Sequence, residues 1–179
     1  RDLVEGYVDN AENGIFGYGG KLNIRPPFQR EFVYSDAKRL AVIDTLTQGF
    51  PLNVMYWSVC DDGTFEIIDG QQRITSLFLL LRAIYTKLVK GDDANTDAAR
   101  NFIGKIEPAI WRTDNLTGKV DYSDILLTSK VVDNAGNEIL RKILETGEAD
   151  IKADDNYSKN YLQFQKLYDK HCSESPLQI

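Results

Sequence analysis

One apolar pattern constrains the fold of this chain more than any other feature of the sequence. Apolar residues recur at intervals of three and four positions, at Ile74, Leu77, Phe78, Leu81, Ile84, Tyr85 and Leu88. This spacing places them on one face of an α-helix of about four turns, and Gly91 is a typical stop for it. Leu79 and Leu80 fall outside that face, so we expect the helix to be buried on more than one side. The core is therefore expected to form around this helix.

The sequence upstream of this helix is typical of β-strands. Residues 53–59 (NVMYWSV) and 64–68 (TFEII) are rich in β-branched and aromatic side chains and flank an Asp-Asp-Gly turn, which predicts a β-hairpin. Residues 22–24 predict a further short strand, which ends before two prolines because proline donates no ladder hydrogen bond. We interpret Tyr56 and Trp57 as core residues of the hairpin rather than as a surface for stacking bases.

Three further helices are predicted. The first begins at the N-cap candidate Ser35 and stops at Gly49. Its apolar residues at helical spacing are Ala37, Leu40, Ile43 and Leu46. Residues 138–146 predict a short amphipathic helix that stops at Gly147. A last helix is expected to have one face lined by Tyr157, Tyr161, Phe164, Leu167 and Tyr168.

The remaining segments carry weaker patterns. Residues 2–20 are polar and rich in glycine, and we interpret them as a weakly helical start that leads into a loop. Residues 98–111 give a mixed signal, and residues 122–128 predict a strand. The expected fold class is α/β, with a small mixed sheet flanked by helices. We expect residues 1–91 to form the core domain and residues 92–179 to form a helical extension packed on it.

The composition narrows the range of functions. The 179-residue chain is 42% hydrophobic, which suffices for a core without disulfides. Its two cysteines and its single histidine, His171, lack metal-ligand spacing, so zinc sites and haem-attachment motifs are excluded. Unpaired cysteines fit a reducing, cytoplasmic setting, and no segment approaches the ~18 apolar residues of a membrane span. The net charge of -6 argues against a protein that coats nucleic acid without sequence preference.

The run Asp69-Gly70-Gln71-Gln72-Arg73 carries the most informative chemistry, because it lies where a predicted strand meets the long helix. A helix start offers unpaired backbone N–H groups and the positive end of the helix dipole, and this combination binds anions. Gly70 would allow a phosphate to approach the backbone, and the Arg73 guanidinium can bind two phosphate oxygens in parallel. Gln71 and Gln72 could reach a phosphate, a base or an attacking water. The pattern predicts a nucleotide or another phosphoester as ligand.

A purely structural interpretation of the same run is also open. Asp69 and Gln72 have the spacing of a capping box, in which each side chain satisfies an N–H group at the helix start. Capping does not explain Arg73, whose positive charge would lie at the unfavourable end of the helix dipole. The Asp69 carboxylate would repel a phosphate, so in the ligand-binding interpretation it either caps the helix or binds the ligand through Mg²⁺.

A second candidate segment lies before the first predicted helix, at residues 25–32 (RPPFQREF). Its two prolines stiffen the chain around Gln29 and Arg30, although by itself this segment is better explained as a surface turn. The bases in residues 21–45 are Lys21, Arg25, Arg30, Lys38 and Arg39, and the acids are Glu31, Asp36 and Asp44, which leaves this part at +2 in an acidic chain. An anion-binding surface is therefore expected in the N-terminal half.

Three motifs together resemble the N-terminal domain of GmrSD-type, modification-dependent restriction systems. They are residues 22–34 (LNIRPPFQREFVY), the helix that leads into residues 49–57 (GFPLNVMYW), and residues 62–77 (DGTFEIIDGQQRITSL). The resemblance implies a ParB/sulfiredoxin-like fold in which a strand-to-helix turn binds nucleotide phosphates. It also implies nucleoside triphosphate binding or hydrolysis, a role in phage defence, and a neighbouring nuclease of the HNH type. Since an HNH site needs histidines, we expect that nuclease in a C-terminal domain missing from this chain, or in a partner.

The resemblance assigns roles to individual residues. Those expected to contact the nucleotide are Gln29, Arg30, Lys38, Gly70, Gln71, Gln72, Arg73 and Thr75. The candidates for catalysis are Asp69, Gln72, Arg73 and Arg30, and Asp69 is the expected Mg²⁺ ligand. In a hydrolytic site the arginines would stabilise charge on the transferred phosphoryl group and a glutamine would position water.

Two other functional classes are compatible with the sequence. In a DNA-binding or specificity module of the ParB type, Lys38 and Arg39 in the basic N-terminal half would contact phosphates, and the affinity for DNA would fall steeply with salt. In a structural interaction domain, the Asp69–Arg73 run would be only a capped helix start.

Overall fold

The computed structural model describes residues 8–10, 14–16, 22–23, 35–49, 54–59, 61, 65–92, 94–114, 116–127 and 135–172. In these ranges the helices are α1 (Asp36–Thr47), α2 (Gln71–Lys90), α3 (Asp97–Ile110), α4 (Ala135–Thr146) and α5 (Asn156–Cys172). The strands are β1 (Val8–Asn10), β2 (Gly14–Phe16), β3 (Leu22–Asn23), β4 (Tyr56–Val59), β5 (Phe65–Asp69), β6 (Trp111–Thr113) and β7 (Val120–Ile125). The fold class is mixed α/β, as predicted.

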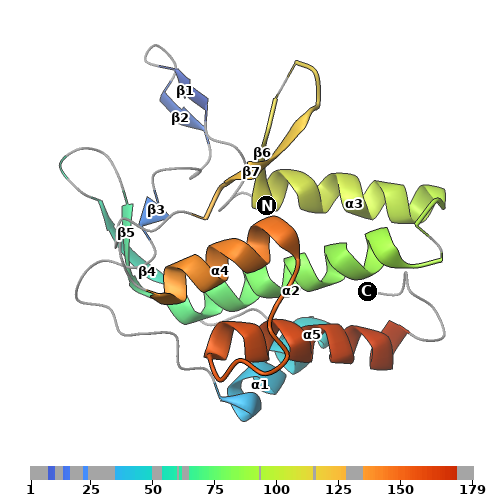
Figure 1. Ribbon diagram of the computed structural model, residues 1–179. Coiled ribbons are helices and arrows are strands. Elements are labelled where there is room, and N and C mark those ends of the chain that lie inside the picture. The colour runs from blue at the N-terminus through green and yellow to red at the C-terminus, as the bar shows by residue number, and fades with distance from the viewer. Residues whose placement is uncertain are drawn as a thin grey trace.

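A small mixed sheet precedes the long helix. Strand β5 lies in its centre, parallel to β3 and antiparallel to β4. This arrangement confirms the predicted hairpin and the predicted short strand beside it. The hairpin lies at the end of the molecule where α2 begins (Figure 1). The central strand of the sheet therefore leads directly into the start of α2.

The prediction for the first part of the chain is wrong where the structure describes it. Strands β1 and β2 pair antiparallel, with Val8 opposite Phe16 and Asn10 opposite Gly14. Asn10 and Gly14, which suggested a loop, therefore lie at the ends of these two short strands. The β-branched and aromatic residues Val8, Ile15 and Phe16 favour extended backbone, and so few of them in a polar stretch give a weak signal.

Helix α2 is the centre of the core, as its pattern predicts. It contacts α3, α4 and α5, and these helices surround it in Figure 1. Leu79, which lies outside the main apolar face, is 0% exposed, so the helix is buried on more than one side. The buried cluster joins α2 to Leu140, Ile143 and Leu144 of α4 and to the aromatic residues Tyr157, Tyr161 and Phe164 of α5. The two predicted C-terminal helices are therefore confirmed, and three residues of the predicted face of α5 are buried.

Two other predictions need correction in detail. The mixed signal of residues 98–111 arises because α3 ends at Ile110 and strand β6 begins at the next residue, Trp111. On α1, Leu40 is exposed, whereas Val42 and Ile43 are buried. The buried side of α1 is therefore rotated from the predicted apolar face, because tertiary packing decides which side of a weakly amphipathic helix is covered.

A buried arginine ties α2 to the end of α4. The Nε atom of Arg82 donates to the Leu144 carbonyl at 2.9 Å, and Nη2 donates to the Glu145 carbonyl at 3.4 Å. Both carbonyls belong to the last turn of α4, which has no intrahelical donors for them and carries the negative end of the helix dipole. Burial lowers the pKa of Arg82. The Tyr161 hydroxyl of α5 donates to the Gly147 carbonyl at 2.9 Å, just past the same helix end.

An aromatic and carboxylate cluster joins α2, α3 and β7. The hydroxyls of Tyr85 and Tyr122 donate to Glu107 Oε1 at 3.1 and 2.8 Å. The buried Trp111 ring meets both tyrosine rings edge-on, with centroids 4.9 and 5.0 Å apart. Burial is the main cause of the raised pKa of Tyr85, so its phenol stays protonated at pH values well above the usual pKa of a tyrosine. The β6–β7 hairpin is thereby fixed against the helices.

Candidate anion-binding site at the start of helix α2

The predicted strand-to-helix junction is present and is built around Gly70. Strand β5 ends at Asp69, and α2 begins at Gln71. Gly70 between them has φ +116°, a conformation that side chains with a Cβ rarely adopt. A Cβ added there would lie 2.5 Å from Cγ of Met55, the residue just before β4. The glycine is therefore required for the turn and for close packing on Met55.

The contact with Met55 changes what Gly70 can offer to a ligand. The space where a Cβ would point is occupied by a side chain, so a phosphate cannot approach from that side. The predicted contact with an anion must instead come from backbone N–H groups at the start of α2, which point away from the helix along its axis.

The N-cap residue of α2 has no side chain and Asp69 does not occupy the cap position, so the capping-box interpretation is wrong. The N-cap position is Gly70, which has no side chain, and the first turn contains no acidic residue. Asp69 is the last residue of β5, too early to cap the helix. The first backbone hydrogen bond of the helix runs from the Ile74 N–H group to the Gly70 carbonyl, at 3.0 Å.

Asp69 instead pairs with Arg73, four residues later. The Arg73 Nη2 atom donates to Asp69 Oδ2 at 2.8 Å and to the Val54 carbonyl at 3.1 Å. The Arg73 side chain is 13% exposed and that of Asp69 is 65% exposed. The pair explains how a cation is tolerated at the positive end of a helix, and it holds the guanidinium beside the helix start. In both of these hydrogen bonds, which join described residues, the donor atom of Arg73 is Nη2.

The other predicted residues lie at different depths. Gln71 and Thr75 are buried, with 4% and 3% of their surface exposed, and Gln72 is half-buried. Residues from Asp69 to Thr75 are thus gathered in one strand end and the first turns of one helix. Lys38 is exposed on α1, which is a separate element. Gln29 and Arg30 lie outside the described residues, so their predicted half of the site stays a prediction.

Binding of a metal ion at this junction would depend on further metal-coordinating atoms supplied by the bound ligand. The described part of the chain contains no group of three or more His, Cys, Asp or Glu residues that could hold a metal. The single carboxylate at the junction, Asp69, is exposed and accepts a hydrogen bond at Oδ2. Mg²⁺ is commonly bound through one or two carboxylates together with phosphates and waters. Asp69 fits such a shared site and does not fit a protein-only cage.

Tyr56 is a residue at this junction that the sequence prediction places wrongly. Trp57 packs against the core as predicted, but Tyr56 is 60% exposed. Side chains alternate between the two faces of a strand, so two neighbouring aromatic residues rarely point the same way. The ladder pairs Tyr56 with Asp69. Applying this alternation to the predicted hairpin would have identified Tyr56 as an exposed residue.

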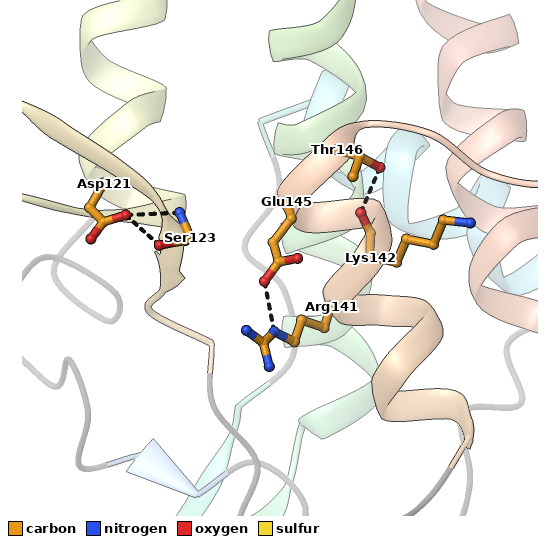
Figure 2. Close-up of polar contacts among 6 residues, drawn as sticks. All are labelled: Asp121, Ser123, Arg141, Lys142, Glu145 and Thr146. Atoms are coloured by element: carbon orange, nitrogen blue, oxygen red, sulfur yellow. Dashed lines mark hydrogen bonds and ion pairs between the residues drawn. The ribbon is translucent and has the colours of Figure 1, made fainter.

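A second polar surface, between β7 and α4, does not form a comparable site. Asp121 accepts hydrogen bonds from the Ser123 N–H and hydroxyl groups at 3.0 and 2.6 Å, and the Ser123 hydroxyl is the main cause of a lowered pKa at Asp121. Arg141 pairs with Glu145 at 2.7 Å within α4. Figure 2 shows that the marked contacts stay within each element, and no dashed line joins the strand to the helix. These charges are satisfied locally.

The chain belongs to the family described as GmrSD restriction endonuclease, N-terminal domain, whose model matches residues 4–176. The match confirms the family suggested by the three motifs and extends well beyond them, through α3, α4 and α5. No curated protein and no solved structure matches the chain significantly.

Membership of this family identifies a protein of restriction and phage defence, and a restriction domain suggests that DNA is involved. No helix in the described ranges is long and apolar enough to cross a membrane.

Proposed function

We propose that this domain binds a nucleoside triphosphate with Mg²⁺ at the start of α2, and that nucleotide binding regulates DNA cleavage by a restriction nuclease. The observation that carries the proposal is the start of α2, where the N-cap of a 20-residue helix is a glycine and an arginine is held beside it by Asp69. Membership of a restriction family supplies the biological context.

The electrostatics of the junction favour a phosphate. The dipole of a long helix contributes about half a positive charge at its start, and the first turn has no carboxylate to neutralise it. The Arg73 guanidinium is largely shielded from water, which strengthens its interaction with an anion, and the paired Asp69 carboxylate offsets its charge until Mg²⁺ binds that carboxylate. Because Asp69 and the Val54 carbonyl already hold the guanidinium, little side-chain entropy would be lost on binding.

Most of the predicted residues have a defined role in this proposal. Backbone N–H groups of the first turn and Arg73 would bind the phosphates. Asp69, whose side chain is 65% exposed, would hold Mg²⁺ together with phosphate oxygens, and the metal would neutralise their charge. Gln72, which is half-buried, would orient a water molecule if the nucleotide is hydrolysed. Gln29, Arg30 and Lys38 would complete the site from the N-terminal half.

The test is calorimetric titration with ATP, GTP and CTP in the presence of Mg²⁺. The Arg73→Ala variant is expected to lose about ten- to a hundredfold in affinity, since a hydrogen bond to a charged group contributes about 1.5–3 kcal/mol. Arg73→Lys keeps the charge but not the fork, so it should restore only part of this loss. Arg141→Ala is the matched control, because it removes an exposed helical arginine that pairs with Glu145 within α4 (Figure 2). Equal affinity of the parent and Arg73→Ala would contradict the proposal.

A further inference from the structure

An exposed aromatic ring lies directly beside the proposed phosphate site. In the antiparallel pair of β4 and β5, Tyr56 is the ladder partner of Asp69. Partners in a ladder project from the same face of the sheet with Cβ atoms about 5 Å apart. The Tyr56 side chain therefore begins next to the carboxylate that holds Arg73, and it is 60% exposed.

An irregularity in the ladder separates Tyr56 from its neighbour. The register shifts between Tyr56 and Trp57, so that Trp57 pairs with Ile67 and Ile68 is left between the two pairs. Trp57 packs against the core, whereas Tyr56, Ile68 and Val54 are exposed. Bulges of this kind re-aim side chains and are frequent beside functional sites. The result is an aromatic and apolar surface at the edge of a cationic helix start.

The helix start and the exposed aromatic ring match the two ends of a nucleotide, which are its phosphates and its base. A phosphate chain is an anion. A base is a flat aromatic group, and any of the bases can stack on a tyrosine ring. We infer that the Tyr56 ring is the surface on which the base of the bound nucleotide stacks. This inference rests on the proposed function and adds to it the recognition of the base. A mononucleotide is favoured over a DNA strand because the described residues of the junction offer one exposed ring beside one anion site, in a chain of net charge -6.

The experiment compares a nucleotide with the same phosphates without a base. Mg²⁺-ATP and Mg²⁺-tripolyphosphate are titrated into the parent, Tyr56→Ala and Tyr56→Phe. We expect Tyr56→Ala to weaken ATP binding by on the order of tenfold, the effect of losing one stacked base, and to leave tripolyphosphate binding unchanged. Tyr56→Phe keeps the ring and should bind both ligands as the parent does. Because Tyr56 is exposed, the variants are expected to keep the melting temperature of the parent, which is measured alongside.

The outcomes separate the inference from the proposal on which it rests. If the parent binds both ligands and Tyr56→Ala still binds ATP as tightly, the stacking inference is wrong and the phosphate site stands. If the parent binds neither ligand, the proposed function and the inference both fall. If Tyr56→Ala weakens binding of a single-stranded oligonucleotide but not of ATP, the ring serves DNA and the inference is overturned. An equal loss for ATP and tripolyphosphate would also overturn it, because the ring would then act on the phosphates.

Discussion

Replacing Gly70 by alanine tests whether the β5–α2 junction is held by its contact with Met55. Two costs can be estimated from the structure. A residue with a Cβ in left-handed backbone costs about 1–2 kcal/mol, and Gly70 has φ +116°. The new Cβ would also lie 2.5 Å from Met55 Cγ and 3.0 Å from its Cβ, and such overpacking typically costs about 1–3 kcal/mol. We therefore expect Gly70→Ala to lower the free energy of unfolding by about 2–5 kcal/mol.

A matched control isolates the contact. Gly118 also has positive φ, at +68°, but a Cβ there would have nothing within 4 Å. Gly118→Ala should therefore cost only the backbone part, about 1–2 kcal/mol. In a Met55→Ala background, most of the extra cost of Gly70→Ala should disappear, because only the contact with the Cβ of residue 55, at 3.0 Å, remains; a double-mutant cycle measures this.

The assay is urea unfolding followed by circular dichroism, with the free energy of unfolding obtained by linear extrapolation. If Gly70→Ala costs no more than Gly118→Ala, or if its cost is unchanged without Met55, the packing argument is refuted.

Three further predictions concern stability. Arg82→Met should lower the free energy of unfolding by about 2–3 kcal/mol, because the buried carbonyl of Leu144 loses a charged donor; urea unfolding measures this, and a loss below about 0.5 kcal/mol would contradict it. Tyr85 has a folded pKa above its unfolded value of about 10, so its contribution is complete below that pH and is lost as the pH rises above it. Melting temperatures between pH 8 and 11 should therefore fall less for Tyr85→Phe than for the parent, and parallel curves would contradict this. Asp69→Asn should cost at most about 1 kcal/mol, because its pair with Arg73 is largely exposed on the carboxylate side; a larger loss by thermal unfolding would argue for a buried structural role.

The long helix is the element that the sequence predicts best, because many apolar residues share one period. In α2 the spacing of Ile74, Phe78 and Leu88 agrees with their burial, and even the extra apolar residue Leu79 is correctly expected to be covered. The hairpin is predicted for a similar reason, since its strands and its turn point to the same structure. By contrast, the pair β1–β2 has three residues in each strand, too few for a periodic signal.

The candidate site is predictable in position but not in detail. The sequence places an anion site where β5 meets α2, because a strand pattern and a helix pattern adjoin there. It does not predict that Asp69 pairs with Arg73 rather than capping the helix, because the choice depends on where β5 ends relative to the first helical residue. Nor does it predict the packing of Met55 on Gly70, which requires the fold of the hairpin onto the helix start. Contacts between elements are set by tertiary structure, which a local pattern does not contain.

The most direct test of the proposed nucleotide site is a titration of the ¹⁵N-labelled domain with Mg²⁺-ATP, Mg²⁺-GTP and Mg²⁺-CTP, followed by backbone amide NMR. The account predicts saturable shifts of the amide resonances of residues 70–73 with at least one nucleotide, while those of α4 residues 138–146 stay in place. Saturable binding that shifts resonances elsewhere and leaves residues 70–73 unchanged would contradict the account.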